Sequence, residues 1–162
     1  DDQTFQPDVI LRLLDHQVDL VAPLVPMRYP PFNLVMYKQL EFRNRPDGSL
    51  VFLSDYYRLS DIGAQTGLRK VQGLPKAGLL VRENVWQVLK DPWFKVGRIS
   101  PDEIDDDRLF MWDAKQAGFD LWADYDQSLG HMRTMDLQVY RDGEGRLALR
   151  GEMHGQRVGL TR

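Results

Sequence analysis

The residues best suited to chemistry form a carboxylate cluster at positions 102–107, where five of six residues are Asp or Glu. Aligned carboxylates can accept a proton from a reacting hydroxyl or supply oxygen ligands to a hard divalent cation. His131 follows the cluster in a Gly-His pair and could add an imidazole ligand. The sequence therefore raises the question of whether this cluster holds a proton and a metal.

Spacing predicts which carboxylates face inward. Ser100, followed by Pro-Asp-Glu, matches a capping box and predicts a helix over 100–117. Its apolar stripe includes Phe110, and stepping back three or four residues gives Asp107 and Asp106. Both would then sit in the second turn, extending the buried face of the helix.

A solvated helix start is the competing interpretation. Carboxylates near a helix N-terminus each gain about 0.3–1 kcal/mol from the macrodipole, and this gain suffices to account for Asp102 and Glu103. An inward-pointing charge needs a partner or a wet cleft. For Asp106 and Asp107, spacing alone leaves both interpretations open, while Asp105 is expected to be solvated.

Elements expected to position these residues alternate between helix and strand, which is typical of an α/β fold. A short amphipathic helix is expected after Pro7, with Val9, Ile10, Leu13 and Leu14 on one face. The other predicted elements are strands over 20–25, 34–42, 50–53, 77–81 and 119–123, a helix over 83–89 and a C-terminal hairpin turning at 142–145. Gly118 is expected to end the 100–117 helix.

Composition sets outer limits. The chain has 162 residues, 43% hydrophobic and 28% charged, as expected for one folded domain. A net charge of −3 does not indicate a nucleic-acid partner, and no apolar run is long enough for a membrane span. Cysteine is absent, which excludes disulfides and thiolate chemistry and is compatible with a reducing compartment. We expect a cytoplasmic location.

The order of several motifs resembles family 2 glycosyltransferases with the GT-A fold. That family shows a Pro-Trp-Phe-like segment, an acid pair, an aromatic residue, a helix ending in Ala-Gly-Phe, a short Trp-containing strand and a Gly-His. The matching residues here are Pro92-Trp93-Phe94, Asp106-Asp107, Phe110, Ala117-Gly118-Phe119, Trp122–Asp124 and Gly130-His131. The first acid is Asp106 where the family has Glu.

The resemblance extends to the start of the chain. Asp1-Asp2 matches the last two positions of an Asp-x-Asp motif, with a Phe three residues on. On this pattern the family's nucleotide-binding half would precede Asp1. We expect a single domain over 1–162, with residues 1–132 forming the acceptor and metal half of a GT-A-like mixed sheet flanked by helices, and 133–162 a hairpin extension.

The resemblance implies a glycosyltransferase that moves a sugar from a nucleotide-diphosphate donor to a hydroxyl acceptor. It implies Asp2 and His131 as ligands of Mn²⁺ or Mg²⁺, Asp107 as the general base and Asp106 as an orienting acid. Further substrate-binding candidates are Asp1, Trp93, Lys76, Gly78 and Arg28. The segment 74–78 departs from the family by losing two glycines.

Several of these residues also fit purely structural roles. Trp93 fits the core as well as a sugar platform, Arg28 fits a surface salt bridge, and an isolated histidine such as His131 is most often structural. His16 and His154 are expected to be structural. For the whole chain, the alternatives are a non-catalytic domain that binds a protein or glycan and, less favoured because the chain has only three histidines, a metal-dependent hydrolase.

Overall fold

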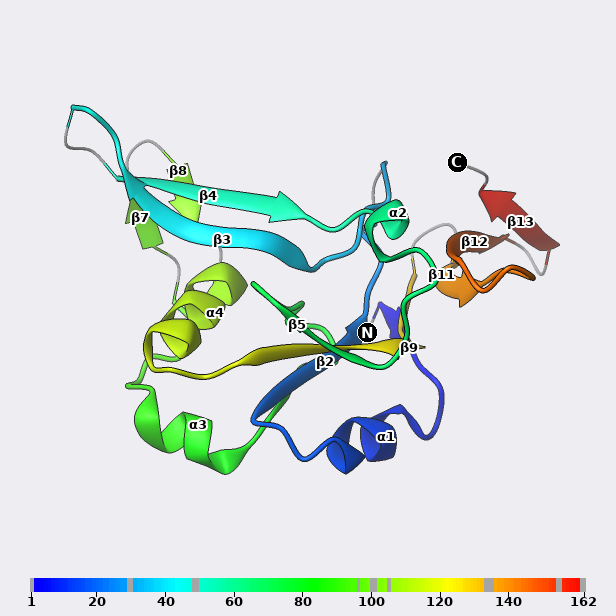
Figure 1. The fold of residues 1–162 in the computed structure, drawn as a ribbon, viewed down its shortest axis with the longest axis horizontal. Coiled ribbons are helices and arrows are strands. Elements are labelled where there is room, and N and C mark those ends of the chain that lie inside the picture. The colour runs from blue at the N-terminus through cyan, green and yellow to red at the C-terminus, as the bar shows by residue number, and fades with distance from the viewer. Residues whose placement is uncertain are drawn as a thin grey trace.

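The computed structural model describes residues 2–28, 31–47, 50–95, 97–99, 102–104, 106–132, 136–153 and 156–160. Within these ranges the chain is a mixed α/β protein with four helices and several small sheets (Figure 1). In the same ranges, no helix has both the length and the apolar character required to cross a bilayer.

The central sheet has the strand order β5-β9-β2-β6. These strands are β5 (Leu68–Val71), β9 (Leu121–Ser128), β2 (Leu20–Leu24) and β6 (Leu80–Val81). β2 runs parallel to β9, whereas β5 and β6 are antiparallel to their neighbours. The carboxyl ends of β2 and β9 therefore meet at one edge of the sheet.

β2 is covered on both faces, as its continuous apolar run predicts. Leu20, Ala22 and Leu24 belong to the larger core cluster, on the side of α4 (Asp106–Gln116). Val21 belongs to a second cluster with residues of α1 (Val9–Asp15). The alternation of side chains along the strand separates the two cores.

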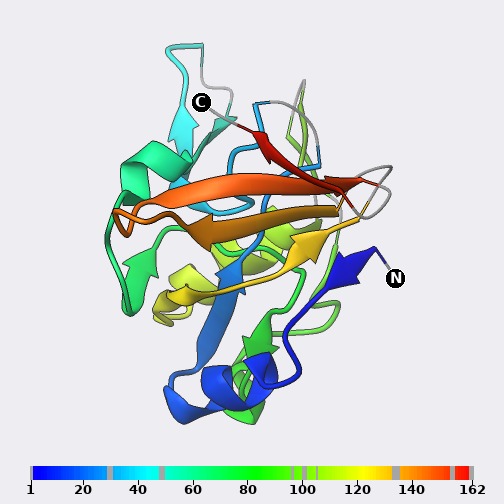
Figure 2. The same cartoon turned by 90° about the vertical axis from the view of Figure 1, so that its right-hand side faces the viewer.

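A second sheet has five antiparallel strands in the order β1-β10-β11-β12-β13 (Figure 2). Its strands are β1 (Gln3–Thr4), β10 (Gly130–His131), β11 (Asp136–Arg141), β12 (Leu147–Met153) and β13 (Gln156–Leu160). The pairing of β11 with β12 confirms the hairpin predicted around 142–145. β1 and β10 join this sheet to the end of β9.

Two further hairpins and two short helices complete the described elements. They are β3 (Tyr37–Asn44) with β4 (Leu50–Tyr56), β7 (Gly97–Ile99) with β8 (Asp102–Ile104), α2 (Leu59–Ile62) and α3 (Glu83–Val88). β3 and β4 confirm the strands expected over 34–42 and 50–53, and α3 confirms the helix expected over 83–89.

The prediction of a helix starting at Ser100 is wrong. Residues 102–104 pair with 97–99 as a hairpin, and α4 begins only at Asp106. Strand pairing has overridden the local capping signal. The end of the helix is as predicted: Gly118 has φ +91°, and its N–H and that of Phe119 bond back to Lys115 and Ala114.

Two other expectations hold only in part. Val9 and Leu13 of α1 are buried, but Ile10 and Leu14 are 55% and 47% exposed. The strand expected over 77–81 shortens to Leu80–Val81, because a turn at 76–78 places Gly78 at φ +67°. Both differences concern the ends or edges of elements whose type is correct.

Candidate metal and acid site

Three candidate residues lie beyond the carboxyl ends of the parallel strands. Arg28 follows β2, His131 follows β9, and Asp2 precedes β1, which pairs with β10 in the register Gln3↔His131. The Asp2 carbonyl accepts a hydrogen bond from the Met132 N–H at 2.7 Å. Parallel sheets commonly bind ligands outside their carboxyl ends. We call Asp2, Arg28 and His131 the strand-end group.

His131 is oriented by its backbone surroundings. Its Nδ1 lies 2.9 Å from the carbonyl oxygen of Pro26. A carbonyl can only accept, so Nδ1 carries the proton and Nε2 presents a lone pair. Nε2 lies 3.5 Å from the Asp2 carboxylate, and the His131 side chain is only 15% exposed.

Arg28 closes the group. Its Nε donates to His131 Nε2 at 3.2 Å, and its guanidinium forms an ion pair with the Asp2 carboxylate. The arginine thereby satisfies the two atoms that the resemblance assigns to a metal. The sequence is compatible with surface pairing of Arg28, but it contains no signal for these partners, which are distant along the chain.

The donor set suits a divalent cation that keeps other ligands. One carboxylate oxygen and one imidazole nitrogen converge, and the Nδ1–carbonyl bond is the outer support commonly found behind metal-bound histidines. Among the residues described there is no cluster of three or more metal-ligating side chains. Phosphate oxygens and water would have to complete the shell, and Arg28 would have to turn away. Asp1 lies outside the described residues.

Asp106, Asp107 and Lys76 form a second group at the start of α4, which we call the helix-start group. Lys76 Nζ donates to Asp106 Oδ2 at 2.7 Å, and Asp106 Oδ1 accepts from the Asp107 N–H at 2.9 Å. Because α4 begins at Asp106, both acids occupy the first turn, not the second. This correction favours the helix-start interpretation, since the macrodipole acts most there. Asp105 lies outside the described residues.

Asp107 faces a buried tyrosine that the sequence does not mark as functional. Burial raises the pKa of the Tyr37 hydroxyl above its ordinary range, and the nearby Asp107 carboxylate and the Tyr56 hydroxyl add to the rise. The two tyrosine oxygens lie 3.1 Å apart. Tyr37 therefore stays protonated beside Asp107 at neutral pH, and its place in an apolar strand gives no functional signal.

Gly78 connects the two groups through the turn that carries Lys76. A Cβ at Gly78 would lie 2.8 Å from Leu129 Cδ1 and 3.1 Å from Pro23 Cγ. The turn therefore lies directly on the ends of β2 and β9. Glycine is required here by both the close approach and the positive φ.

Trp93 belongs to neither group. Its ring packs edge-on against Trp86 of α3, with centroids 5.1 Å apart, and its indole N–H donates to the Leu89 carbonyl. The residue nevertheless keeps 39% exposure and lines a cavity beside the last turns of α4. Trp93 is therefore packed on one side and exposed on the other, and its role as a sugar platform stays a prediction.

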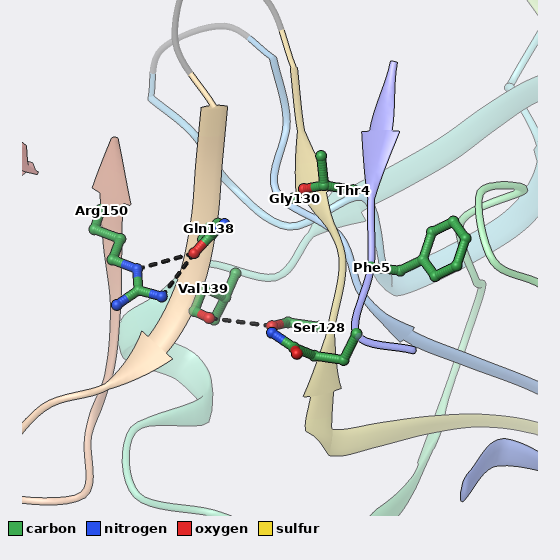
Figure 3. A pocket seen from close by; sticks show the side chains of 8 residues that line it. Thr4, Phe5, Ser128, Gly130, Gln138, Val139 and Arg150 are labelled. Carbon is green, nitrogen blue, oxygen red and sulfur yellow. Dashed lines mark hydrogen bonds between the residues drawn. The ribbon is translucent and has the colours of Figure 1, made fainter. Parts of the chain in front are cut away.

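A small polar cavity of about 110 Å³ adjoins the strand-end group (Figure 3). Thr4 and Gly130, one step from Gln3 and His131, line it from the paired strands β1 and β10. On its far wall, Arg150 donates twice to the Gln138 side-chain oxygen. This wall connects β11 and β12 and supports the edge that carries His131.

His16 is held by a partner that the sequence does not reveal. Its Nε2 lies 2.7 Å from Oδ2 of Asp124, whose residue is 3% exposed. Asp124 Oδ1 also accepts from the Asp126 N–H. The pair ties the end of α1 to β9, which agrees with a structural role for His16. His154 lies outside the described residues.

Comparisons with protein-family models, curated proteins and solved structures return no match.

Proposed function

We propose that the chain forms the acceptor and metal half of a GT-A-type glycosyltransferase, acting on a nucleotide-diphosphate sugar and a hydroxyl acceptor. One observation carries the proposal: Asp2 and His131, from segments far apart in the sequence, place a carboxylate and an oriented imidazole nitrogen 3.5 Å apart beyond two parallel strands. A histidine that only fills the core does not need a nearby carboxylate or an Nε2 held in one orientation.

The proposed reaction releases a diphosphate leaving group and transfers one proton from the acceptor to the protein. The acceptor oxygen bonds to the anomeric carbon, the bond from that carbon to phosphate breaks, and the diphosphate leaves with the electron pair. Asp107 takes the acceptor's proton, as a general base. A bound Mn²⁺ or Mg²⁺, held by Asp2 and His131, would offset the charge on the departing diphosphate.

Lys76 and Arg28 supply the fixed positive charges. Arg28 can exchange its contact with Asp2 for a phosphate of the donor, because a guanidinium matches both oxyanions. Lys76 holds Asp106 by an ion pair of 2.7 Å, and so fixes the first turn of α4 on which Asp107 stands. In this arrangement Asp106 is a positioning residue.

A non-catalytic domain is the second candidate, favoured by the closed strand-end group. The ion pair and hydrogen bonds among Asp2, Arg28 and His131 satisfy these residues internally. A scaffold that had lost its cation would be stable in this form.

Sugar transfer by the parent protein, at its natural length, distinguishes the two candidates. Radiolabelled nucleotide sugars are supplied with Mn²⁺ and with mixed hydroxyl acceptors, and His131→Gln serves as the inactive variant. Transfer that depends on Mn²⁺ and is lost in His131→Gln supports the enzyme. Absence of both transfer and donor hydrolysis across the panel supports the binding domain.

A further inference from the structure

The cavity beside Trp93 has the composition of a sugar-binding subsite. It measures about 290 Å³, and it lies where α3 meets the last turns of α4. Its lining combines an aromatic ring, apolar side chains and a charged or polar rim: Trp93, Val88, Lys90, Lys95, Asp113 and Gln116. Ligand cavities commonly pair apolar surface with a few convergent polar groups.

The ring of Trp93 can contribute only its surface. Its indole N–H is already bonded to the Leu89 carbonyl at 2.9 Å, and packing on Trp86 fixes the ring plane. An immobilised, half-exposed aromatic surface suits the apolar C–H side of a pyranose ring. It loses little conformational entropy on binding, because the side chain is already ordered.

The rim can satisfy hydroxyl groups of either polarity. Lys95 and Asp113 form an ion pair of 2.7 Å, with side chains 45% and 37% exposed. An exposed pair of this kind is weak and rearranges readily. The ammonium can donate to a sugar hydroxyl while the carboxylate accepts from the next one. Gln116 adds a further donor and acceptor.

The position of the cavity relative to the acid group sets the length of the ligand. Asp106 and Asp113 lie seven residues apart on α4, and therefore on one face of the helix, while Asp107 follows Asp106 in the same first turn, about 100° round the axis. The rise from Asp106 to Asp113 is about 10 Å, which exceeds a single sugar ring. Between these two positions of α4, the buried ring of Phe110 is stacked on Phe94, which is itself 40% exposed.

We propose that the Trp93 cavity binds an internal or distal sugar of an oligosaccharide acceptor that extends along α4 to its first turn, where Asp106 and Asp107 lie. The acceptor is then a glycan chain and not a monosaccharide or small alcohol. This inference rests on the proposed function for the identity of the reacting end, but glycan binding itself does not require catalysis.

The test is oligosaccharide binding to the chain, measured by calorimetry and by proton–nitrogen NMR. The probes are neutral gluco- and chito-oligosaccharides of increasing length, with a free monosaccharide and a uridine nucleotide for comparison. We expect one oligosaccharide series to bind, with affinity that rises with length and shifts concentrated at Lys95, Asp113 and Gln116. No binding by any oligosaccharide, or stronger binding of the nucleotide at these residues, would overturn the proposal.

Variants of Trp93 separate the aromatic surface from folding. Trp93→Leu removes the ring but keeps an apolar contact with Trp86, and should weaken binding by about ten-fold or more, the usual scale for truncating a tryptophan anchor. Trp93→Phe keeps a ring and should restore most of the affinity. Phe5→Leu, which removes an aromatic side chain that is 60% exposed outside this cavity, is the matched control. Unchanged binding by a folded Trp93→Leu protein would contradict the assignment.

The two proposals fail in distinguishable ways. Glycan binding that depends on Trp93, in a parent protein that transfers no sugar, would keep the subsite and remove the enzyme. Transfer to glycans that is indifferent to Trp93→Leu would keep the enzyme and remove the subsite.

Discussion

The strand-end group and the helix-start group are built by different means. Asp2, Arg28 and His131 come from three distant parts of the chain and meet only because β1 pairs with β10 and β2 lies parallel to β9. Asp106 and Asp107 are neighbours in a first helical turn, and their local hydrogen bonds run to adjacent N–H groups. Convergence of distant polar groups is difficult to explain by local structure, whereas an acidic first turn is common.

The geometry supports the two halves of the proposed site unequally. His131 has a fixed tautomer, low exposure and an oriented lone pair. For Asp107, the geometry offers a nearby protonated tyrosine and an exposed lysine bound to the preceding acid. Substitutions at Asp107 therefore test the weaker half of the site, and substitutions at the strand-end group test the stronger half.

Replacement of Asp107 should have the largest effect. Asp107→Asn keeps the shape but removes the proton acceptor, so transfer by the parent protein should slow by about 10²–10⁴-fold. Glu83→Gln, which alters an acid in the first turn of α3, is the control for the dipole. Its transfer rate should stay unchanged, and each variant should lose only about 0.3–1 kcal/mol of stability. If Asp107→Asn slowed transfer no more than Glu83→Gln does, the acid cluster would be only a helix start.

Gly78→Ala should break the connection between the groups. A Cβ would meet Leu129 and Pro23 and would force a left-handed conformation, so unfolding free energy should fall by about 2–5 kcal/mol. Urea unfolding followed by fluorescence measures this.

Gly67→Ala separates backbone strain from close packing. Gly67 has φ +73° but nothing within 4 Å of the added Cβ, so only about 1–2 kcal/mol should be lost. If the two alanine variants were equally stable, the turn at Gly78 would not be packed as described.

Arg28→Gln tests whether the arginine hinders cation binding by occupying the Asp2 carboxylate and His131 Nε2. Arg28 competes with a cation for Asp2 and His131, so its removal should raise Mn²⁺ affinity a few-fold, since a half-exposed ion pair contributes about 0.2–1 kcal/mol. Affinity for inorganic pyrophosphate should fall in the same variant. A fall in both affinities would mean that Arg28 orders the cation ligands and does not compete for them.

Lys76→Met should give the smallest effect on stability, at most about 1 kcal/mol, because its ion pair with Asp106 is largely exposed. Lys70→Met removes an exposed pair with Asp120 together with a cation–π contact 5.1 Å from the Trp122 ring centroid, and should cost a similar amount or slightly more. Transfer should slow only in Lys76→Met. Matching transfer rates would remove Lys76 and Asp106 from the site.

Much of the scaffold was predictable because its signals are local or periodic. The run over 20–25 is apolar without alternation, and β2 is buried on both faces. The turn residues at 142–145 separate two strand-like runs, and β11 pairs with β12. Gly118 ends α4 as its sequence context predicts.

The errors come from tertiary contacts that leave no local trace. Ser100 carries a strong capping signal, yet pairing between 97–99 and 102–104 moves the helix start to Asp106. The Arg28–His131 and His16–Asp124 contacts depend on the packing of segments 103 and 108 residues apart. Spacing within one segment contains no information about such partners.

Manganese binding to the chain, followed by electron paramagnetic resonance in the presence of pyrophosphate, tests the proposed cation site most directly. We expect one bound ion. Its affinity should fall at least about ten-fold in both Asp2→Asn and His131→Gln, because even the loss of a residue that supports a metal ligand has an effect of this size. Asp8→Asn, at an exposed aspartate paired with Arg12, should bind manganese as tightly as the unsubstituted chain does. Equal affinity in all four proteins would contradict a cation site at Asp2 and His131.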